Sequence, residues 1–154
     1  MNRFNVRVYG VLKNSEHEVL VTDELIRGSE YTKFPGGGLE FGEGTRDCLK
    51  REFLEEMNLH VDVGAHLYTT DFFQMSAFNP EHQIISIYYW VTALEELNVR
   101  ISTRPFQFDD AQREAYKQHN ECESFRFIPL HRLTEDAVSL PIDKVVVRLI
   151  KEQL

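Results

Sequence analysis

Residues 37–59 read GGLEFGEGTRDCLKREFLEEMNL, and this stretch decides the fold. Thr45 to Met57 predicts an amphipathic helix, because an apolar residue recurs every four positions, at Leu49, Phe53 and Met57. Thr45 is the expected N-cap, since its hydroxyl can accept from a free backbone N–H group of the first turn. Asn58 stands where a left-handed residue often ends a helix, and asparagine tolerates that conformation.

A second face of this helix is acidic. Glu52, Glu55 and Glu56 have the spacing i, i+3 and i+4, which places them within one sector of about 100°. Like charges at these spacings repel. A divalent cation would turn this repulsion into attraction, and ligands that are all oxygen suit Mg²⁺ or Mn²⁺. Such an ion also bridges carboxylates to phosphates and activates water.

The alternative is a solvated glutamate face with Arg46, Lys50 and Arg51 as ordinary surface neighbours. The residues before the helix favour a binding site. The run 36–38 is all glycine, which allows a tight turn that brings backbone groups close to a ligand. Glu43 adds a fourth carboxylate, and Arg51 can orient one glutamate through an ion pair.

The rest of the chain predicts a mixture of strands and helices. Phe4 to Leu12 and Glu18 to Thr22 are expected to form a hairpin, and residues 24–30 a loop. Further strands are expected at Tyr31–Phe34, 59–77, 82–94 and Ser124–Ile128, and further helices at 109–120 and 141–152, the last with Pro141 in its first turn. This pattern predicts an α/β (α+β type) fold, with residues 1–154 as a single domain.

Composition limits the classes of function that the protein can have. The formal net charge of −8 argues against a binder of nucleic acid polymers, which needs a basic surface. No run approaches the ~18 apolar residues of a membrane span. The start, Met1-Asn2-Arg3-Phe4, has no signal-peptide core, and Cys48 and Cys122 have no metal-site or redox spacing. We therefore expect a cytoplasmic protein with free thiols and no membrane partner.

The stretch 37–59 resembles the Nudix box. In that family's pattern a Gly is followed after five residues by a Glu, and after seven more by Arg-Glu, an apolar residue, any residue, Glu-Glu, any residue, Gly and an apolar residue. The matching residues are Gly37, Glu43, Arg51, Glu52, Phe53, Glu55, Glu56 and Leu59. The one departure is Asn58 in place of Gly, which we expect to preserve the helix end. The resemblance implies an α/β/α sandwich around a mixed β-sheet.

The resemblance also implies roles for these residues. Glu52, Glu55 and Glu56 would bind catalytic Mg²⁺ or Mn²⁺, with the Gly37 carbonyl as a further ligand. Arg51 would orient a box carboxylate, with Glu43 and Gly38 in support. Glu52 or Glu55 would serve as the general base. The implied reaction is hydrolysis of a phosphoanhydride bond in a nucleoside diphosphate linked to another group.

Residues outside the box are less decisive. A further ligand or base is sought among Glu121, Glu123, Asp109 and Asp110, and a phosphate contact from Arg104 or Arg113, although surface arginines are usually solvated. His82 could contact phosphate or be structural. The aromatic residues that could stack on a base or fill the core are Phe72, Phe73, Phe78, Tyr88 and Tyr89.

Two hypotheses about function follow. The first is a hydrolase acting on a small nucleotide. The second is a nucleotide-sensing Nudix-fold module without turnover, which we would expect to have lost box carboxylates; this chain keeps all four. A homodimer is common in the family, but no residue pattern here fixes it.

Overall fold

The computed structural model describes all 154 residues, which divide into two compact units. The first unit comprises Met1–Leu12 and Pro35–Leu97, and the second comprises Lys13–Phe34 and Asn98–Leu154. None of the helices is long and apolar enough to cross a lipid bilayer. Each unit has its own β-sheet, so the predicted α+β class with a mixed sheet is confirmed.

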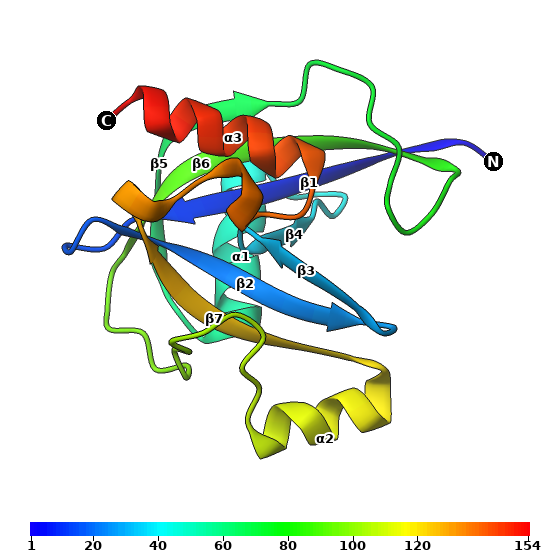
Figure 1. The fold of residues 1–154 in the computed structure, drawn as a ribbon. Helices are drawn as coiled ribbons and strands as arrows, with labels where there is room; N and C mark the ends of the chain where they lie inside the picture. Colours follow the sequence, from blue (N-terminus) through cyan, green and yellow to red (C-terminus); the bar gives the residue numbers. More distant parts are fainter. The chain divides into compact units, whose positions relative to one another are not determined.

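The first unit is a four-stranded mixed sheet with one helix packed on it (Figure 1). Its strand order is β4 (Gly36–Gly38), β1 (Arg3–Leu12), β6 (His82–Ala93) and β5 (Val61–Thr69). β1 pairs with β6 in parallel and with β4 antiparallel, and β5 pairs with β6 antiparallel. The helix α1 (Thr45–Met57) begins and ends where the apolar spacing predicted.

Close packing joins α1 to the middle of this sheet. A Cβ atom added to Gly10 of β1 would lie 2.7 Å from a Val91 methyl group of β6, 3.1 Å from Phe53 and 3.3 Å from Leu49, so a side chain here would crowd both β6 and the helix. Leu49, Phe53 and Met57 are all buried, as their spacing predicted. The box helix is therefore fixed on the sheet by one face and leaves its acidic face for a site.

The two ends of α1 follow local rules. Asn58 has φ 50° and ψ 41°, and its N–H donates to the Leu54 carbonyl, which confirms the predicted left-handed helix end. The N-cap prediction is wrong by one residue, because Gly44 is the cap and Thr45 is the first helical residue. The Thr45 hydroxyl instead shares a hydrogen bond of 2.7 Å with the Tyr89 hydroxyl, which ties the helix start to β6.

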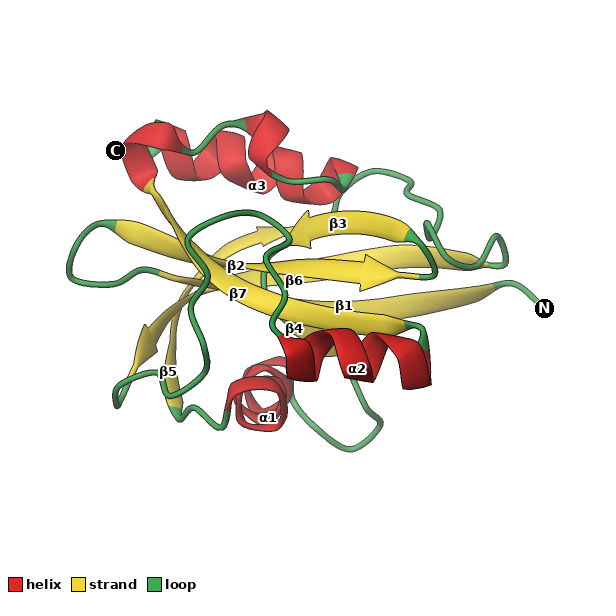
Figure 2. Ribbon diagram, turned by 60° about the horizontal axis from the view of Figure 1, so that its bottom comes forward, coloured by secondary structure: helices red, strands yellow, loops and turns green.

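The second unit contains a three-stranded antiparallel sheet of order β3 (Ser29–Lys33), β2 (Glu18–Ile26) and β7 (Glu121–Pro129). Helix α2 (Asp110–His119) lies beside β7 (Figure 2), and α3 (Pro141–Glu152) begins at Pro141, as predicted. Two short 3₁₀ turns, Leu130–Arg132 and Glu135–Ala137, lead into α3. The buried side chains of α3 include Ile142, Val146, Val147 and Ile150.

Three strand predictions need correction. β1 and β2 do not form a hairpin, because both edges of β1 are taken by β4 and β6. Residues 24–30 are not a loop: β2 continues to Ile26, and Arg27 and Gly28, at φ 50° and 82°, turn the chain into β3. That two-residue turn with positive φ suits the twist of a hairpin. The strand expected over 59–77 ends at Thr69, and residues 70–81 form a loop.

Candidate active site

One arginine gathers the carboxylates of the box. The Arg51 guanidinium binds Glu43 with two hydrogen bonds, of 3.0 Å and 2.6 Å, and donates to Glu52 at 3.0 Å and to Glu55 at 3.2 Å. It also donates to the Gly38 carbonyl at 3.0 Å. A fork of fixed N–H donors can satisfy several acceptors at once, which a lysine cannot do. The structure therefore brings Arg51, Glu43, Glu52, Glu55 and Gly38 together.

These contacts set the charge states of the cluster. The Arg51 hydrogen bonds and the Glu40 backbone N–H hold the pKa of Glu43 at about 2. The same pairing with Glu43, followed by Glu52, raises the pKa of Arg51 above its ordinary value. Glu40 adds another carboxylate, 3.7 Å from Arg51. One guanidinium thus faces four carboxylates, so the cluster keeps an excess of negative charge.

The glycine before the helix gives Glu52 its position. A Cβ atom added to Gly37 would lie 2.4 Å from Cδ and from Oε1 of Glu52, so the carboxylate packs directly against the Gly37 backbone. At Gly38 an added Cβ would meet only Arg7, at 3.7 Å. A side chain at position 37 would therefore displace the Glu52 carboxylate, whereas one at position 38 would not. Glu52 is mostly buried, with 14% of its side chain exposed.

The other two glutamates differ in exposure. Glu55 is open to solvent, with 58% of its side chain exposed, whereas Glu56 is half-buried. No group of three or more His, Cys, Asp or Glu side chains is arranged to hold a metal ion. The Arg51 guanidinium lies between the box carboxylates.

Cys48 lies beneath this cluster and takes no charge. Its thiol is fully buried and donates to the Gly38 carbonyl at 3.5 Å. Burial, followed by the hydrogen bond with Glu43, raises the pKa of Cys48 to about 12. The thiol is therefore neutral at physiological pH and packs as a small apolar group.

The other predicted site residues lie in the second unit. Glu121 is exposed at the start of β7, and Glu123 is half-buried and stands opposite Glu24 of β2. Arg104 is exposed in the loop before α2. Asp109 caps α2, accepting from the Gln112 N–H at 2.8 Å, which gives it a structural role.

Asp110 and Arg113 form a surface ion pair at 3.7 Å on α2. Such exposed pairs contribute little to stability.

The aromatic candidates divide into two groups. Tyr88 and Tyr89 are core residues, 1% and 8% exposed, whereas Phe72, Phe73 and Phe78 are exposed.

Sequence reasoning missed a buried ion pair in the second unit. Asp23 is fully buried in β2 and accepts two hydrogen bonds from Arg126 of β7, at 2.6 Å and 3.1 Å. It also accepts from the Thr32 hydroxyl at 2.7 Å and from the Phe106 N–H at 3.3 Å. The available signal was an aspartate two residues after the apolar run 19–21, since a buried charge needs a partner.

The box geometry agrees with a comparison against protein families. The sequence matches the NUDIX domain model over residues 3–149. The chain belongs to the Nudix family. This match covers nearly the whole chain and confirms the predictions of Nudix membership and of a Nudix-type hydrolase. A comparison with curated protein sequences finds no significant match.

Solved Nudix structures share the fold at low sequence identity. A MutT Nudix hydrolase from Burkholderia pseudomallei has a TM-score of 0.68 at 13% identity, over 96% of this chain and 98% of that one. An ADP-ribose pyrophosphatase from Streptococcus suis has 0.58 at 16%, over 97% and 90%. A UDP-X diphosphatase has 0.62 at 17%, over 97% of this chain and 62% of that one. At these identities the similarity concerns the fold alone.

Proposed function

We propose that the protein hydrolyses a phosphoanhydride bond in a nucleoside diphosphate linked to another group, and that it requires Mg²⁺ or Mn²⁺. The observation that carries this proposal is the Arg51 cluster, in which Glu43, Glu52 and Glu55 converge beside Gly37 and Gly38. Two proteins of similar fold, a UDP-X diphosphatase and an ADP-ribose pyrophosphatase, support this substrate class.

The donor set fits a hard divalent cation. All its side-chain ligands are carboxylates, and the cluster keeps negative charge after Arg51 is counted. The absence of a side chain at Gly37 leaves its backbone beside the Glu52 carboxylate. Glu52, Glu55, Glu56 and the Gly37 carbonyl would hold the ion. When bound, it would polarise a phosphoryl oxygen and lower the pKa of a water molecule.

The protein's own groups have separate tasks in this proposal. Arg51 stays charged and holds Glu52 and Glu55 at fixed positions, while Glu43 anchors Arg51. Glu52 or Glu55 takes the proton from the attacking water. Preorganised charge of this kind lowers a barrier because it needs no rearrangement during the reaction.

We further infer that residues 1–154 act as a single Nudix domain, since one family model spans sequence from both units. Arg104, Glu121 and Glu123 of the second unit remain proposed contacts to the substrate. A cytoplasmic location agrees with two free cysteines. The possible homodimer and the exclusion of nucleic acid polymers remain predictions.

A substrate screen tests the proposal. Purified protein is assayed for phosphate or nucleotide release from oxidised nucleoside triphosphates, nucleotide sugars, ADP-ribose and dinucleotides, with Mg²⁺, Mn²⁺ or a chelator. We expect turnover that needs the metal and falls at least 100-fold in Glu55→Gln and Glu56→Gln. Glu96→Gln, which removes an exposed charge from the same unit, is the matched control. Tight nucleotide binding without turnover of any substrate would instead indicate a sensing module.

A further inference from the structure

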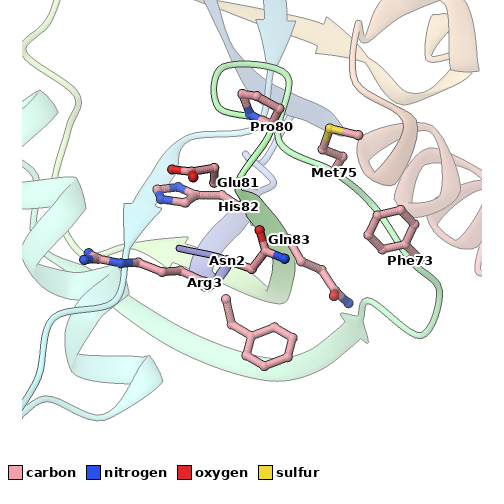
Figure 3. A pocket seen from close by; sticks show the side chains of 9 residues that line it. Asn2, Arg3, Phe73, Met75, Pro80, Glu81, His82 and Gln83 are labelled. Carbon is pink, nitrogen blue, oxygen red and sulfur yellow. The ribbon is translucent and has the colours of Figure 1, made fainter.

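A pocket lies where β1 and β6 begin, in the first unit (Figure 3). It has a volume of about 220 Å³ and is lined by the start of β1, the start of β6 and the loop between β5 and β6. This is smaller than a typical pocket for a whole drug-sized ligand, which measures about 300–1,000 Å³. The pocket therefore suits one ring or a similar fragment of a larger molecule.

Part of the pocket wall is apolar. Phe4, Phe73 and Met75 line it, and they stay 70%, 68% and 45% exposed. Exposed aromatic rings that gather at one place usually mark an interaction site. A planar ring would stack on Phe4 or Phe73 and remove both partners from water.

Two amides give the pocket a polar side. Asn2 and Gln83 line it, and neither amide has a hydrogen-bond partner within the protein. Figure 3 shows Asn2 in the middle of the lining residues, with Gln83 beside it. An amide offers both donors and an acceptor, which is the chemistry that reads the edge of a nucleobase.

Three further polar residues, Arg3, Glu81 and His82, line the pocket. In Figure 3 the Arg3 side chain extends away from Phe73. Glu81 contributes a carboxylate, paired with the amino group of Met1 at 2.9 Å. His82 already contacts another side chain, since its Nε2 lies 3.4 Å from the Asn79 amide nitrogen. The exposed rings and the two amides without protein partners therefore suit a planar heterocycle that carries hydrogen-bond donors and acceptors.

The register connects this pocket to the box. Side chains alternate along a strand, so Phe4 and Val8 lie on the same face of β1, and Gly10 of that face packs under α1. Val8 pairs with Gly37, which contacts Glu52. Four residues of strand separate Phe4 from Val8 by about 14 Å. A nucleoside with a diphosphate, in extended form, bridges a distance of this order.

We propose that this pocket holds the base of the nucleotide whose diphosphate lies at the box. Phe4 and Phe73 stack on the ring of the base, and Gln83 and Asn2 form hydrogen bonds with its edge. This rests on the proposed function. It also names the recognised group as a nucleobase, rather than a sugar or a phosphate.

The test uses binding without hydrolysis. The full chain, without metal, is titrated with the four common nucleosides and with ribose 5-phosphate, and the side-chain amide signals of Asn2 and Gln83 are followed by NMR. We expect at least one nucleoside to shift these signals and ribose 5-phosphate to leave them unchanged. The proposal is overturned if no nucleoside shifts them, or if ribose 5-phosphate does so alone.

Variants separate the pocket from the catalytic site. Phe73→Ala is expected to weaken nucleoside binding at least 5-fold, because stacking on the ring is lost. Gln83→Ala should change the preference among nucleosides. Phe72→Ala removes the neighbouring ring, which does not line the pocket, and should leave binding unchanged. Equal affinity in wild type, Phe73→Ala and Gln83→Ala would reject the proposal.

A final variant tells failure of this proposal apart from failure of the proposed function. Glu55→Gln should bind nucleosides as the wild type does, whatever happens to turnover. If the protein hydrolyses no nucleotide yet binds nucleosides through Phe73, the proposed function fails and the pocket stands. If it hydrolyses nucleotides and Phe73→Ala leaves both KM and nucleoside binding unchanged, the pocket assignment fails alone.

Discussion

Replacing Gly37 by alanine should strongly lower the activity of the proposed hydrolase and only slightly lower its stability. The added Cβ would lie 2.4 Å from Cδ and Oε1 of Glu52 and 2.6 Å from Oε2. Ordinary contact between such atoms needs about 3.5 Å, so the carboxylate has to move by about 1 Å. Glu52 is a flexible side chain, so it can move without unfolding the protein.

The expected effect on the rate is large. Misplacing a catalytic group by about 1 Å can reduce the rate about 100-fold, which corresponds to about 2.7 kcal/mol of lost transition-state stabilisation. The movement also lengthens the 3.0 Å hydrogen bond between Arg51 and Glu52. The melting temperature should fall only slightly, by the equivalent of about 1 kcal/mol.

The assay compares kcat/KM and melting temperature for wild type, Gly37→Ala and Gly38→Ala. The second variant is the matched control, because its Cβ would meet only Arg7 at 3.7 Å and the carbonyl that accepts from Arg51 is kept. Its loss of activity should be several-fold smaller. Equal activity in the two alanine variants, or wild-type kcat/KM in Gly37→Ala, would refute the assigned position of Glu52.

Four further outcomes are expected. The pKa of Glu43 is lowered to about 2, so its ionised form adds stability above pH ~4.5, and this stability is lost as pH falls through about 2. The difference in melting temperature between wild type and Glu43→Gln should therefore be large at pH 6 and small near pH 2. Cys48, with a pKa of about 12, should react with a thiol reagent at pH 8 only after unfolding, as absorbance would show. Asn58→Ala should lower the free energy of unfolding by about 1 kcal/mol in a denaturant titration, since alanine fits the left-handed helix end poorly, whereas Asn58→Gly should not. Asp23→Ala should lower it by about 3 kcal/mol in the same measurement, because Arg126 would lose its buried partner; an unchanged midpoint would contradict this.

The helix of the box could be predicted because each of its sequence signals depends only on nearby residues. The length of α1 follows from the spacing of Leu49, Phe53 and Met57, and its end follows from the backbone preference of Asn58. The meeting of Arg51 with Glu55 is likewise a neighbour relation one helical turn apart. Such relations need no knowledge of the rest of the fold.

Strand pairing was less predictable. β1 and β2 are consecutive and apolar, which favours a hairpin, yet β1 pairs with β6, far away in the sequence. The sequence of one strand does not reveal which other strands will pair with its two edges. The turn at Arg27 and Gly28 was missed because polar residues such as Glu24 hid the alternation of β2.

The pocket at Phe4 and Gln83 was beyond sequence analysis for the same reason. Phe73 was one of several aromatic residues that could stack or fill the core, and only the fold shows it to be exposed beside Gln83. The partner of Asp23 was hidden in the same way, because Arg126 lies on a strand about a hundred residues later.

The parallel ladder between β1 and β6 has a consequence for synthesis. Arg3 pairs with His82 and Leu12 with Val91, so no rung of this ladder can close until most of the first unit has left the ribosome. Pairings of such sequence separation form slowly, because a long loop must be closed before any contact forms. Until then the β6-facing edge of β1 stays unpaired, and the nascent chain is most open to aggregation or chaperone capture during that interval.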